Sequence, residues 1–240
     1  MIKAILFDFN GVIIDDEPIQ LRAYQEILKA EGIALSEEDY YNSMGMDDAT
    51  LLRVTYERAG KELTDEKLNE LIESKVAAHR KATEDGLPLF PGVVNFIKAA
   101  SRHFTLGIVS MARRAEIDDV LSRAGLGEVF DGIVSAEDVE ACKPDPACYN
   151  RGFLLLDEQR RKDGHLNISP HECLVIEDAP PGIQSAREAG MKTLGVTNTV
   201  KDEALRAAGA DVVTHSLADW TVDAVHHVFS EYRSQEASTN

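Results

Sequence analysis

The sequence has few basic residues, few cysteines and no long apolar segment. Lys and Arg number 25 against 42 Asp and Glu, which gives a formal net charge of −17. An acidic protein of this kind repels the phosphates of nucleic acids and anionic membranes, so we expect neither as a partner. No stretch approaches the roughly 20 consecutive apolar residues that a membrane-spanning helix needs. Small anionic substrates are not excluded, because they require only a local positive group or a metal ion.

Cysteine and histidine are also sparse, and their spacing excludes the common zinc-binding patterns. The three cysteines, Cys142, Cys148 and Cys173, are an odd number without a Cys-x-x-Cys pair. We interpret them as reduced thiols, as in a cytoplasmic protein. The first apolar run ends at Asp8, unlike the long apolar region of a secretory signal peptide. We therefore expect a cytoplasmic protein and take a monomer as the default.

The apolar residues, 44% of the chain, occur in short runs that alternate with helical patterns. Continuous apolar runs are typical of strands buried on both faces of a parallel sheet. Between two of these runs, Ile117, Val120 and Leu121 have helical spacing, and Gly125 closes the pattern. The fold class predicted is α/β, a Rossmann-like parallel sheet with helices on both faces. The predicted strands are residues 2–7, 104–109, 133–134, 173–176, 193–196 and 212–213.

One region interrupts this alternation. Residues 17–86 contain only helical patterns, and a segment rich in Gly and Pro at residues 86–92 leads back to the sheet. Asp65 is the predicted N-cap of the last helix in this region. We expect a core domain formed by residues 1–16 and 87–240, with an all-helical cap domain, residues 17–86, inserted after the first strand.

Polar residues follow the predicted strands at one edge of the sheet. In an open parallel sheet, the active site lies beyond the carboxyl ends of the strands. Oxygen ligands gathered there suit Mg²⁺, lysine and serine can hold a phosphoryl group, and an aspartate can attack it. The residues in question are Asp8, Asn10, Ser110, Lys143, Glu177 and Asp178.

Four segments in this order resemble the motifs of the haloacid dehalogenase (HAD) superfamily. Residues 8–12 resemble Asp-x-Asp-Gly-(Val/Thr), and residues 109–110 resemble the second motif. Residues 143–146 resemble Lys-Pro-x-Pro, and residues 177–183 resemble Glu-Asp-(Ser/Ala)-x-x-Gly-Ile. The run that follows, residues 186–191, is typical of the β-phosphoglucomutase-like branch, which also carries a helical cap at the place predicted above.

The resemblance implies a role for each residue of the core. Asp8 would be the nucleophile and form an aspartyl-phosphate intermediate. Mg²⁺ would be held by Asp8, the backbone carbonyl of Asn10 and Asp178, with Glu177 assisting directly or through water.

The resemblance also implies how phosphate and substrate are bound. Ser110, Met111 and Lys143 would bind the transferring phosphate, and Lys143 would also neutralise the nucleophile. Gly45 and Lys75 would contact the substrate from the cap. A lysine on an apolar helix face can alternatively extend its amine to the solvent, and this second interpretation of Lys75 stays open.

Asn10 departs from the pattern of the family. The family carries at this position the acid that protonates the leaving oxygen and later activates water. An amide cannot exchange a proton in this way, and general acid–base catalysis is worth roughly 10²–10⁴ in rate. Three explanations are open: Asn10 was introduced in place of Asp, the nearby Asp16 supplies the acid, or the leaving group needs no proton.

The cap departs from the family as well. The sugar-phosphate mutases of this branch hold the non-reacting phosphate with an arginine in a Gly-x-x-Arg stretch. Here the stretch begins at Gly45 and ends at Asp48, whose charge would repel a second phosphate. We therefore expect a Mg²⁺-dependent phosphohydrolase of a small phosphorylated metabolite. The alternatives are a sugar-phosphate mutase, and a catalytically impaired protein that binds phosphate.

Overall fold

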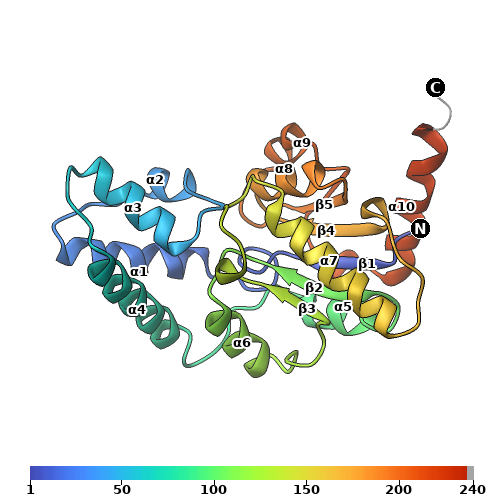
Figure 1. The fold of residues 1–240 in the computed structure, drawn as a ribbon, viewed down its shortest axis with the longest axis horizontal. Coiled ribbons are helices and arrows are strands. Elements are labelled where there is room, and N and C mark those ends of the chain that lie inside the picture. Colours follow the sequence, from blue (N-terminus) through green and yellow to red (C-terminus); the bar gives the residue numbers. More distant parts are fainter. Residues whose placement is uncertain (237–240) are drawn as a thin grey trace.

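The structure is a computed structural model that describes residues 1–236. Within this range, the strands form one sheet in the order β3-β2-β1-β4-β5-β6, and every neighbouring pair is parallel. Figure 1 shows this sheet in the larger part of the molecule, with an all-helical part at one end. The strands are β1 Ala4–Phe7, β2 Thr105–Val109, β3 Gly132–Val134, β4 Cys173–Glu177, β5 Lys192–Val196 and β6 Val212–Thr214.

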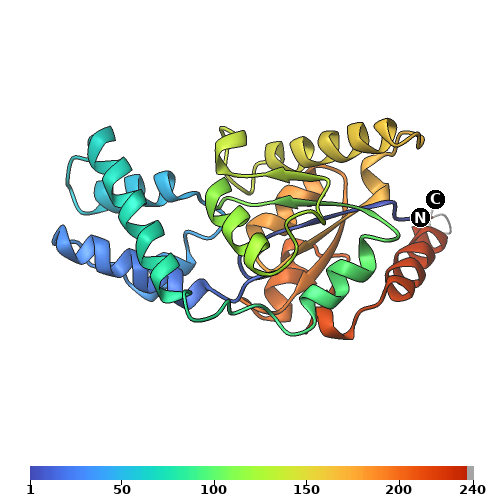
Figure 2. The same cartoon turned by 90° about the horizontal axis from the view of Figure 1, so that it is seen from below.

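Helices cover both faces of the sheet, as Figure 2 shows. Side chains alternate along β1, so that Leu6 packs against one set of helices and Phe7 against the other. The Leu6 face is covered by α7 Ala147–Lys162 and α8 Pro180–Glu188. The Phe7 face is covered by α5 Val93–Ala100, α6 Arg114–Arg123 and α10 Val222–Glu236. A further helix, α9 Asp202–Ala208, packs against α8. The predicted Rossmann-like α/β fold is confirmed.

The remaining helices lie between β1 and β2 in the sequence and form the all-helical part at the left of Figure 1. They have an apolar cluster of their own, which includes Tyr24, Leu28, Leu52 and Leu71. We call this part the cap and the rest the core; the limits of the cap at residues 17 and 86 stay a prediction. The helices are α1 Glu17–Ala30, α2 Glu37–Tyr41, α3 Asp48–Arg58 and α4 Asp65–Ala82.

Two details of the cap differ from the sequence prediction. The N-cap of α4 is Thr64, whose hydroxyl accepts a hydrogen bond from the backbone N–H of Lys67, so the prediction of Asp65 was wrong. Asp65 is instead the first helical residue. The short helix α2 was not predicted, because five residues are too few to show a helical period.

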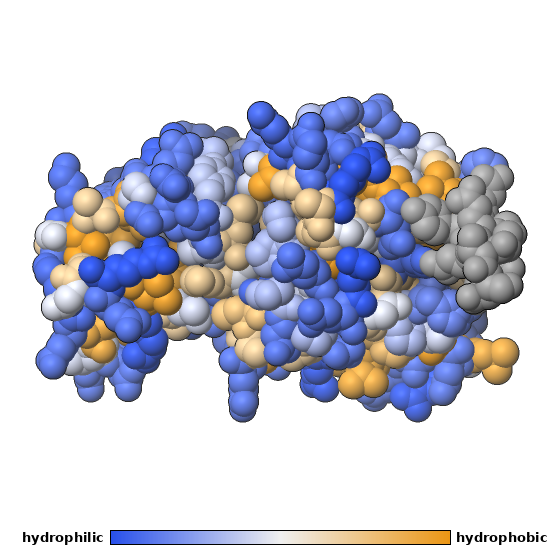
Figure 3. Space-filling view, turned by 90° about the horizontal axis from the view of Figure 1, so that it is seen from above, coloured by the Kyte–Doolittle hydropathy of each residue, from blue (hydrophilic) through white to orange (hydrophobic). Residues whose placement is uncertain are grey.

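Two chain segments connect the cap to the core and pair with each other. The backbone N–H of Asp15 donates to the carbonyl of Pro88 at 2.7 Å, and the N–H of Phe90 donates to that of Ile13 at 3.2 Å. The space-filling view shows a mainly hydrophilic face, with a recess between the cap, at the left, and the core (Figure 3). Among the described residues, no helix has both the length and the apolar character needed to cross a membrane.

Candidate active site

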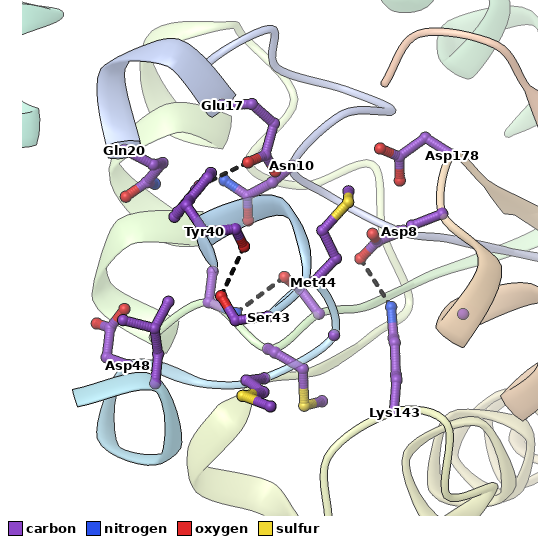
Figure 4. Close-up of a pocket in the computed structure, with 18 of the residues that line it drawn as sticks. Asp8, Asn10, Glu17, Gln20, Tyr40, Ser43, Met44, Asp48, Lys143 and Asp178 are labelled. Atoms are coloured by element: carbon purple, nitrogen blue, oxygen red, sulfur yellow. Dashed lines mark hydrogen bonds and ion pairs between the residues drawn. The ribbon is translucent and has the colours of Figure 1, made fainter. Parts of the chain in front are cut away.

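The polar residues predicted from the strand ends come together in one pocket between the core and the cap (Figure 4). Asp8 follows β1 and Ser110 follows β2. Glu177 is the last residue of β4, and Asp178 comes directly after it. Lys143 comes from the segment before α7 and extends into the same pocket. The convergence has a simple cause, because these parallel strands end at one edge of the sheet.

A tight turn after β1 orients Asp8 and Asn10. The carbonyl of Phe9 accepts hydrogen bonds from the backbone N–H groups of the residues at positions 12, 13 and 14. Gly11 has a φ of +74°, and a Cβ atom there would lie 2.0 Å from Oδ2 of Asp178. Only glycine fits this position, since any side chain would collide with the carboxylate that faces Asp8 across the site.

Lys143 forms ion pairs with Asp8, the candidate nucleophile, and with Glu177 at the end of β4. Its Nζ lies 3.0 Å from Oδ1 of Asp8 and 2.7 Å from Oε1 of Glu177. Burial alone would lower the pKa of the Lys143 ammonium group, but the carboxylates of Asp8 and Glu177 raise it above its ordinary value. Lys143 is therefore a permanent cation beside Asp8.

Both oxygens of Glu177 are occupied by protein donors. Oε1 accepts from Lys143 and from the hydroxyl of Tyr149, each at 2.7 Å. Oε2 accepts from the backbone N–H groups of Asp178 and Ala179 at 3.1 and 3.3 Å. A carboxylate has about four lone-pair sites, so these four contacts engage Glu177 fully within the protein in this structure. Its position indicates that it orients Lys143 and Tyr149.

The site has the composition of a centre for a hard cation. Oxygen atoms of Asp8, Glu177 and Asp178 lie within 4.8 Å of one another. Oδ2 of Asp178 is buried and has no hydrogen-bond partner among the described residues, which is costly unless a ligand binds there. Burial raises the pKa of Asp8 to about 7 although Lys143 opposes the shift, and burial and Glu177 raise the pKa of Asp178. This oxygen donor set fits Mg²⁺.

Ser110 and Met111 line the pocket next to Asp8 and Lys143. The hydroxyl oxygen of Ser110 accepts a hydrogen bond from the backbone N–H of Ala112 at 3.0 Å. Within the described part of the chain the Ser110 hydroxyl donates to no protein group, so its hydrogen can be directed to a phosphate oxygen.

The side chain of Asn10 is held by a buried carboxylate. Its Nδ2 donates to both oxygens of Asp16 at 3.0 Å, and Gln20 donates to Oδ2 of Asp16 at 3.0 Å. Nε2 of His79, on α4, lies 2.7 Å from the same oxygen. Asp16 is 0% exposed and is not among the residues that line the pocket. The geometry therefore favours a positioning role for Asp16 over direct contact with substrate.

The cap contributes a buried lysine to the pocket. Lys75 is 2% exposed, and its Nζ lies 3.1 Å from Oδ1 of Asp48 and 3.0 Å from Oε1 of Glu116. The hydroxyl of Tyr24 donates to Asp48 as well. The interpretation of Lys75 as a lysine that extends to solvent is wrong, because its amine is enclosed by these groups. Since Glu116 belongs to α6 of the core, this ion pair also joins the cap to the core.

Gly45 lies where the loop between α2 and α3 contacts the core. Its φ is +87°, and a Cβ atom there would lie 3.0 Å from Cβ of Pro181 and 3.1 Å from the carbonyl oxygen of Lys143. The residue lines the pocket, and its lack of a side chain allows the cap loop to approach the core closely. The predicted contact of Gly45 with substrate stays a prediction.

The sequence reasoning missed Glu17 as a site residue. Glu17 begins α1, lines the pocket, and accepts a hydrogen bond from the hydroxyl of Tyr40 at 2.6 Å. Burial raises the pKa of Glu17 to about 7. The available signal was its place directly before Pro18, at the start of the first cap helix, where the chain leaves the core.

Comparison with known proteins is consistent with this site. The family of haloacid dehalogenase-like hydrolases matches residues 5–196. The putative phosphatase YhcW of Bacillus subtilis (strain 168) is 32% identical over 203 residues, 83% of this chain and 86% of the relative. The phosphorylated carbohydrates phosphatase of Thermotoga maritima is 29% identical over 214 residues, 87% of this chain and 92% of the relative. One larger relative, SUPPRESSOR OF QUENCHING 1 of Arabidopsis thaliana, is 27% identical over 229 residues, and the matched part is 20% of its length.

A solved structure is similar to this chain over the whole fold, both core and cap. The β-phosphoglucomutase of Clostridium difficile superposes with a TM-score of 0.83 at 23% identity, covering 98% of this chain and 100% of that one. The family match, the parallel sheet with its helical cap and the order of the motifs agree. The chain therefore belongs to the haloacid dehalogenase-like hydrolases, in their β-phosphoglucomutase-like branch.

Proposed function

We propose that this chain is a Mg²⁺-dependent phosphohydrolase that removes the phosphoryl group from a small phosphorylated metabolite, such as a sugar monophosphate. The observation that carries the proposal is the position of Lys143, 3.0 Å from Asp8 and 2.7 Å from Glu177 at the bottom of the pocket. A carboxylate can attack a phosphoryl group only where positive charge offsets the repulsion between the two anions. Lys143 supplies that charge beside Asp8.

Asp8 is the proposed nucleophile, and an aspartyl-phosphate is the proposed intermediate. Asp8, the backbone carbonyl of Asn10 and Asp178 would hold Mg²⁺, which supplies charge neutralisation for the phosphoryl oxygens when bound. The buried oxygen of Asp178 that lacks a partner supports this assignment. Glu177 would act by holding Lys143 rather than as a direct ligand.

Ser110, Met111 and Lys143 are the proposed binding groups for the transferring phosphate. The hydroxyl of Ser110 and the ammonium of Lys143 can donate to phosphoryl oxygens, and both side chains are nearly inaccessible to solvent. In such an environment a charge-assisted hydrogen bond is stronger than in water. The backbone of Met111, which follows Ser110 along the pocket wall, is the third proposed donor.

Hydrolysis of a monophosphate is favoured over mutase activity by the charges on the cap side of the pocket. Lys75 is the cation there, and it is already neutralised by Asp48 and Glu116. The two carboxylates exceed the single charge of Lys75, so a second phosphate would meet net negative charge. A neutral sugar or polyol group, which donates hydrogen bonds, fits these acceptors better.

The test is a screen of phosphate esters, with Mg²⁺ and with a chelator, on the unaltered protein and on Asn10→Asp. The proposal predicts Mg²⁺-dependent phosphate release by the unaltered protein. Turnover in Asn10→Asp alone would instead indicate an impaired enzyme or a phosphate-binding protein. Conversion of a sugar phosphate to its isomer without phosphate release would indicate a mutase.

A cytoplasmic monomer is also proposed. The thiols of Cys148 and Cys173 are buried and unpaired, and Cys142 is also free of a disulfide. Large exposed apolar side chains are few and scattered among the residues described, namely Met1, Leu154 and Leu166. Elution of the protein at the monomer mass in size-exclusion chromatography with light scattering would support the monomer.

A further inference from the structure

We propose that Glu17 is the general acid and base of this enzyme and performs the proton transfers that Asn10 cannot. This role rests on the proposed phosphohydrolase function, and it identifies a catalytic residue outside the four motifs. Three observations support it: the orientation of Asn10, the state of the other carboxylates of the pocket, and the surroundings of Glu17.

The side-chain amide of Asn10 points toward a buried carboxylate and cannot transfer a proton. Its amide nitrogen faces the carboxylate of Asp16, with both oxygens at 3.0 Å, so its N–H donors are used inside the protein. Asp16 cannot replace it directly, because the Asp16 carboxylate is fully buried outside the pocket and also accepts from Gln20. A proton donor to the leaving oxygen must come from another group.

The remaining carboxylates of the pocket, apart from Glu17, are engaged elsewhere. Asp8 is the nucleophile and is paired with Lys143, and Asp178 is a proposed ligand of Mg²⁺. Glu177 accepts four hydrogen bonds from protein groups. Asp48 is paired with Lys75 on the cap side.

Glu17 differs from these groups in its contacts. Within residues 1–236 it makes no ion pair, and its one hydrogen-bond partner is the hydroxyl of Tyr40, which donates to Oε2 at 2.6 Å. The other oxygen, Oε1, can therefore face a substrate. Figure 4 shows Glu17 and Tyr40 on the cap side of the pocket, with Asp8 and Lys143 on the core side. A phosphate ester bound at Asp8 would have its leaving group toward the cap, where Glu17 lies.

The electrostatic surroundings of Glu17 suit proton transfer near neutral pH. Burial raises its pKa from 4.5 to about 7, the hydrogen bond from Tyr40 opposes the shift, and nearby acidic groups add to it. A general acid is most effective when its pKa lies near the working pH. The titratable and charged groups that influence Glu17 are Tyr40 and Tyr41 of α2, Lys75 of α4, Asp16 before α1, and Asp8 and Asp178 of the core.

The proton transfers balance over two steps. In the first, an oxygen of Asp8 bonds to phosphorus, the ester bond to phosphorus breaks, and the leaving oxygen takes the proton of Glu17. In the second, the Glu17 carboxylate takes a proton from water, the water oxygen bonds to phosphorus, and the bond between Asp8 and phosphorus breaks. Inorganic phosphate is released, and Glu17 is again protonated.

Two esters with different leaving groups test this role. The probes are 4-nitrophenyl phosphate, whose leaving group needs no proton, and the sugar monophosphate that is hydrolysed fastest in the screen above. For Glu17→Gln we expect kcat on the sugar phosphate to fall about 10²-fold or more, the range for loss of a general acid. On 4-nitrophenyl phosphate we expect a rapid burst of 4-nitrophenol followed by slow turnover. The first step stays fast because this leaving group needs no proton, and hydrolysis of the aspartyl-phosphate becomes slow because it lacks the Glu17 base.

Matched variants separate catalysis from structure. Glu26→Gln makes the same change at an exposed position of α1 and should leave both rates unchanged. Glu17→Asp keeps the carboxyl group and should recover part of the rate. The role of Glu17 is overturned if Glu17→Gln stays within about twofold of the unaltered enzyme, or loses both activities equally without a burst. If the unaltered protein hydrolyses neither ester, the proposed function fails first, and the role of Glu17 with it.

Discussion

The amide nitrogen of Asn10 lies 3.0 Å from each of the two carboxylate oxygens of Asp16. A carboxylate only accepts hydrogen bonds, so the contact fixes the orientation of the Asn10 amide. The family motif Asp-x-Asp-Gly-(Val/Thr), matched by residues 8–12, has an acid at position 10. Here the acid is at position 16 and the neutral donor at position 10. Asn10 therefore has no proton to transfer, and the carboxylate of Asp16 is buried outside the pocket.

Asp16→Asn tests whether Asp16 is a positioning residue. Asn cannot accept from Asn10, Gln20 and His79 at once, and hydrogen bonds to charged groups contribute about 1.5–3 kcal/mol each. We expect the free energy of unfolding, measured in urea, to fall by about that amount. Turnover should fall by about tenfold or less, compared with about 10²-fold for a lost general acid.

The control for this prediction is Asp15→Asn, the same change at the exposed neighbouring residue, which should alter neither stability nor turnover. A loss of activity in Asp16→Asn as large as that in Glu17→Gln, with stability unchanged, would make Asp16 the acid and contradict the account.

Lys75→Met tests the ion pair between the cap and the core. The substitution leaves Asp48 and Glu116 buried without their cation, and breaking a buried pair in this way costs about 3–5 kcal/mol. We expect a lower urea midpoint, with part of the loss recovered in the double variant Lys75→Met with Glu116→Gln. Lys81→Met, at an exposed position of the same helix, is the matched control. A change of less than about 1 kcal/mol would show that the pair is not formed in solution.

Gly45→Ala tests the contact of the cap loop with the core. An alanine at a φ of +87° is strained by about 1–2 kcal/mol, and its Cβ would also meet Pro181 and Lys143. Gly60→Ala is the matched control, because Gly60 has a φ of +66° with nothing within 4 Å of its added Cβ. Both variants should lose stability, but only Gly45→Ala should raise KM for a phosphate ester. An equal KM in the two variants would contradict a role for Gly45 in closing the pocket.

Mg²⁺ binding should depend on pH. Burial raises the pKa of Asp8 to about 7 and also raises the pKa of Asp178 well above its ordinary value. The folded protein without metal therefore holds these protons more tightly than the unfolded chain does. These two groups therefore reduce stability as the pH rises from about 4 toward 7 and above. Mg²⁺ competes with the same protons, and bound at about 100 times its Kd it would stabilise by about 2.7 kcal/mol.

The measurement is the melting temperature with and without Mg²⁺ at several pH values. The increase caused by Mg²⁺ should be larger at pH 8 than at pH 5.5, and Asp178→Asn should abolish it. An increase that is equal at both pH values, or that persists in Asp178→Asn, would place the ion elsewhere.

Much of the core could be predicted from the sequence, because buried strands appear in it as runs of apolar residues. The inner strands β1, β2, β4 and β5 are covered on both faces, so most of their residues are apolar and form short runs. The residues where such runs end lie at the active edge. Asp8, Ser110 and Asp178 were found in this way. Lys143 was also placed at this edge, although it follows its predicted strand at a longer distance, and the resemblance to the family supplied its role.

The cap side of the site could not be predicted to the same extent, because it depends on how two separate apolar units pack. Glu116 lies on α6 of the core and reaches Lys75 only when the cap is in place. Tyr40 belongs to a helix too short to show a period, so the surroundings of Glu17 had no local signal. The full burial of Asp16 likewise arises from helix α4 lying over the segment that joins core and cap.

The proposed function depends on phosphoryl transfer through Asp8. The most direct test mixes the unaltered protein with a radiolabelled phosphate ester and Mg²⁺, stops the reaction in acid, and maps the label by peptide mass spectrometry. The account predicts an acid-stable phosphoryl group that hydroxylamine removes, on the peptide containing Asp8, and no label in Asp8→Asn. Phosphate release without labelled protein, or release that continues in Asp8→Asn, would contradict it.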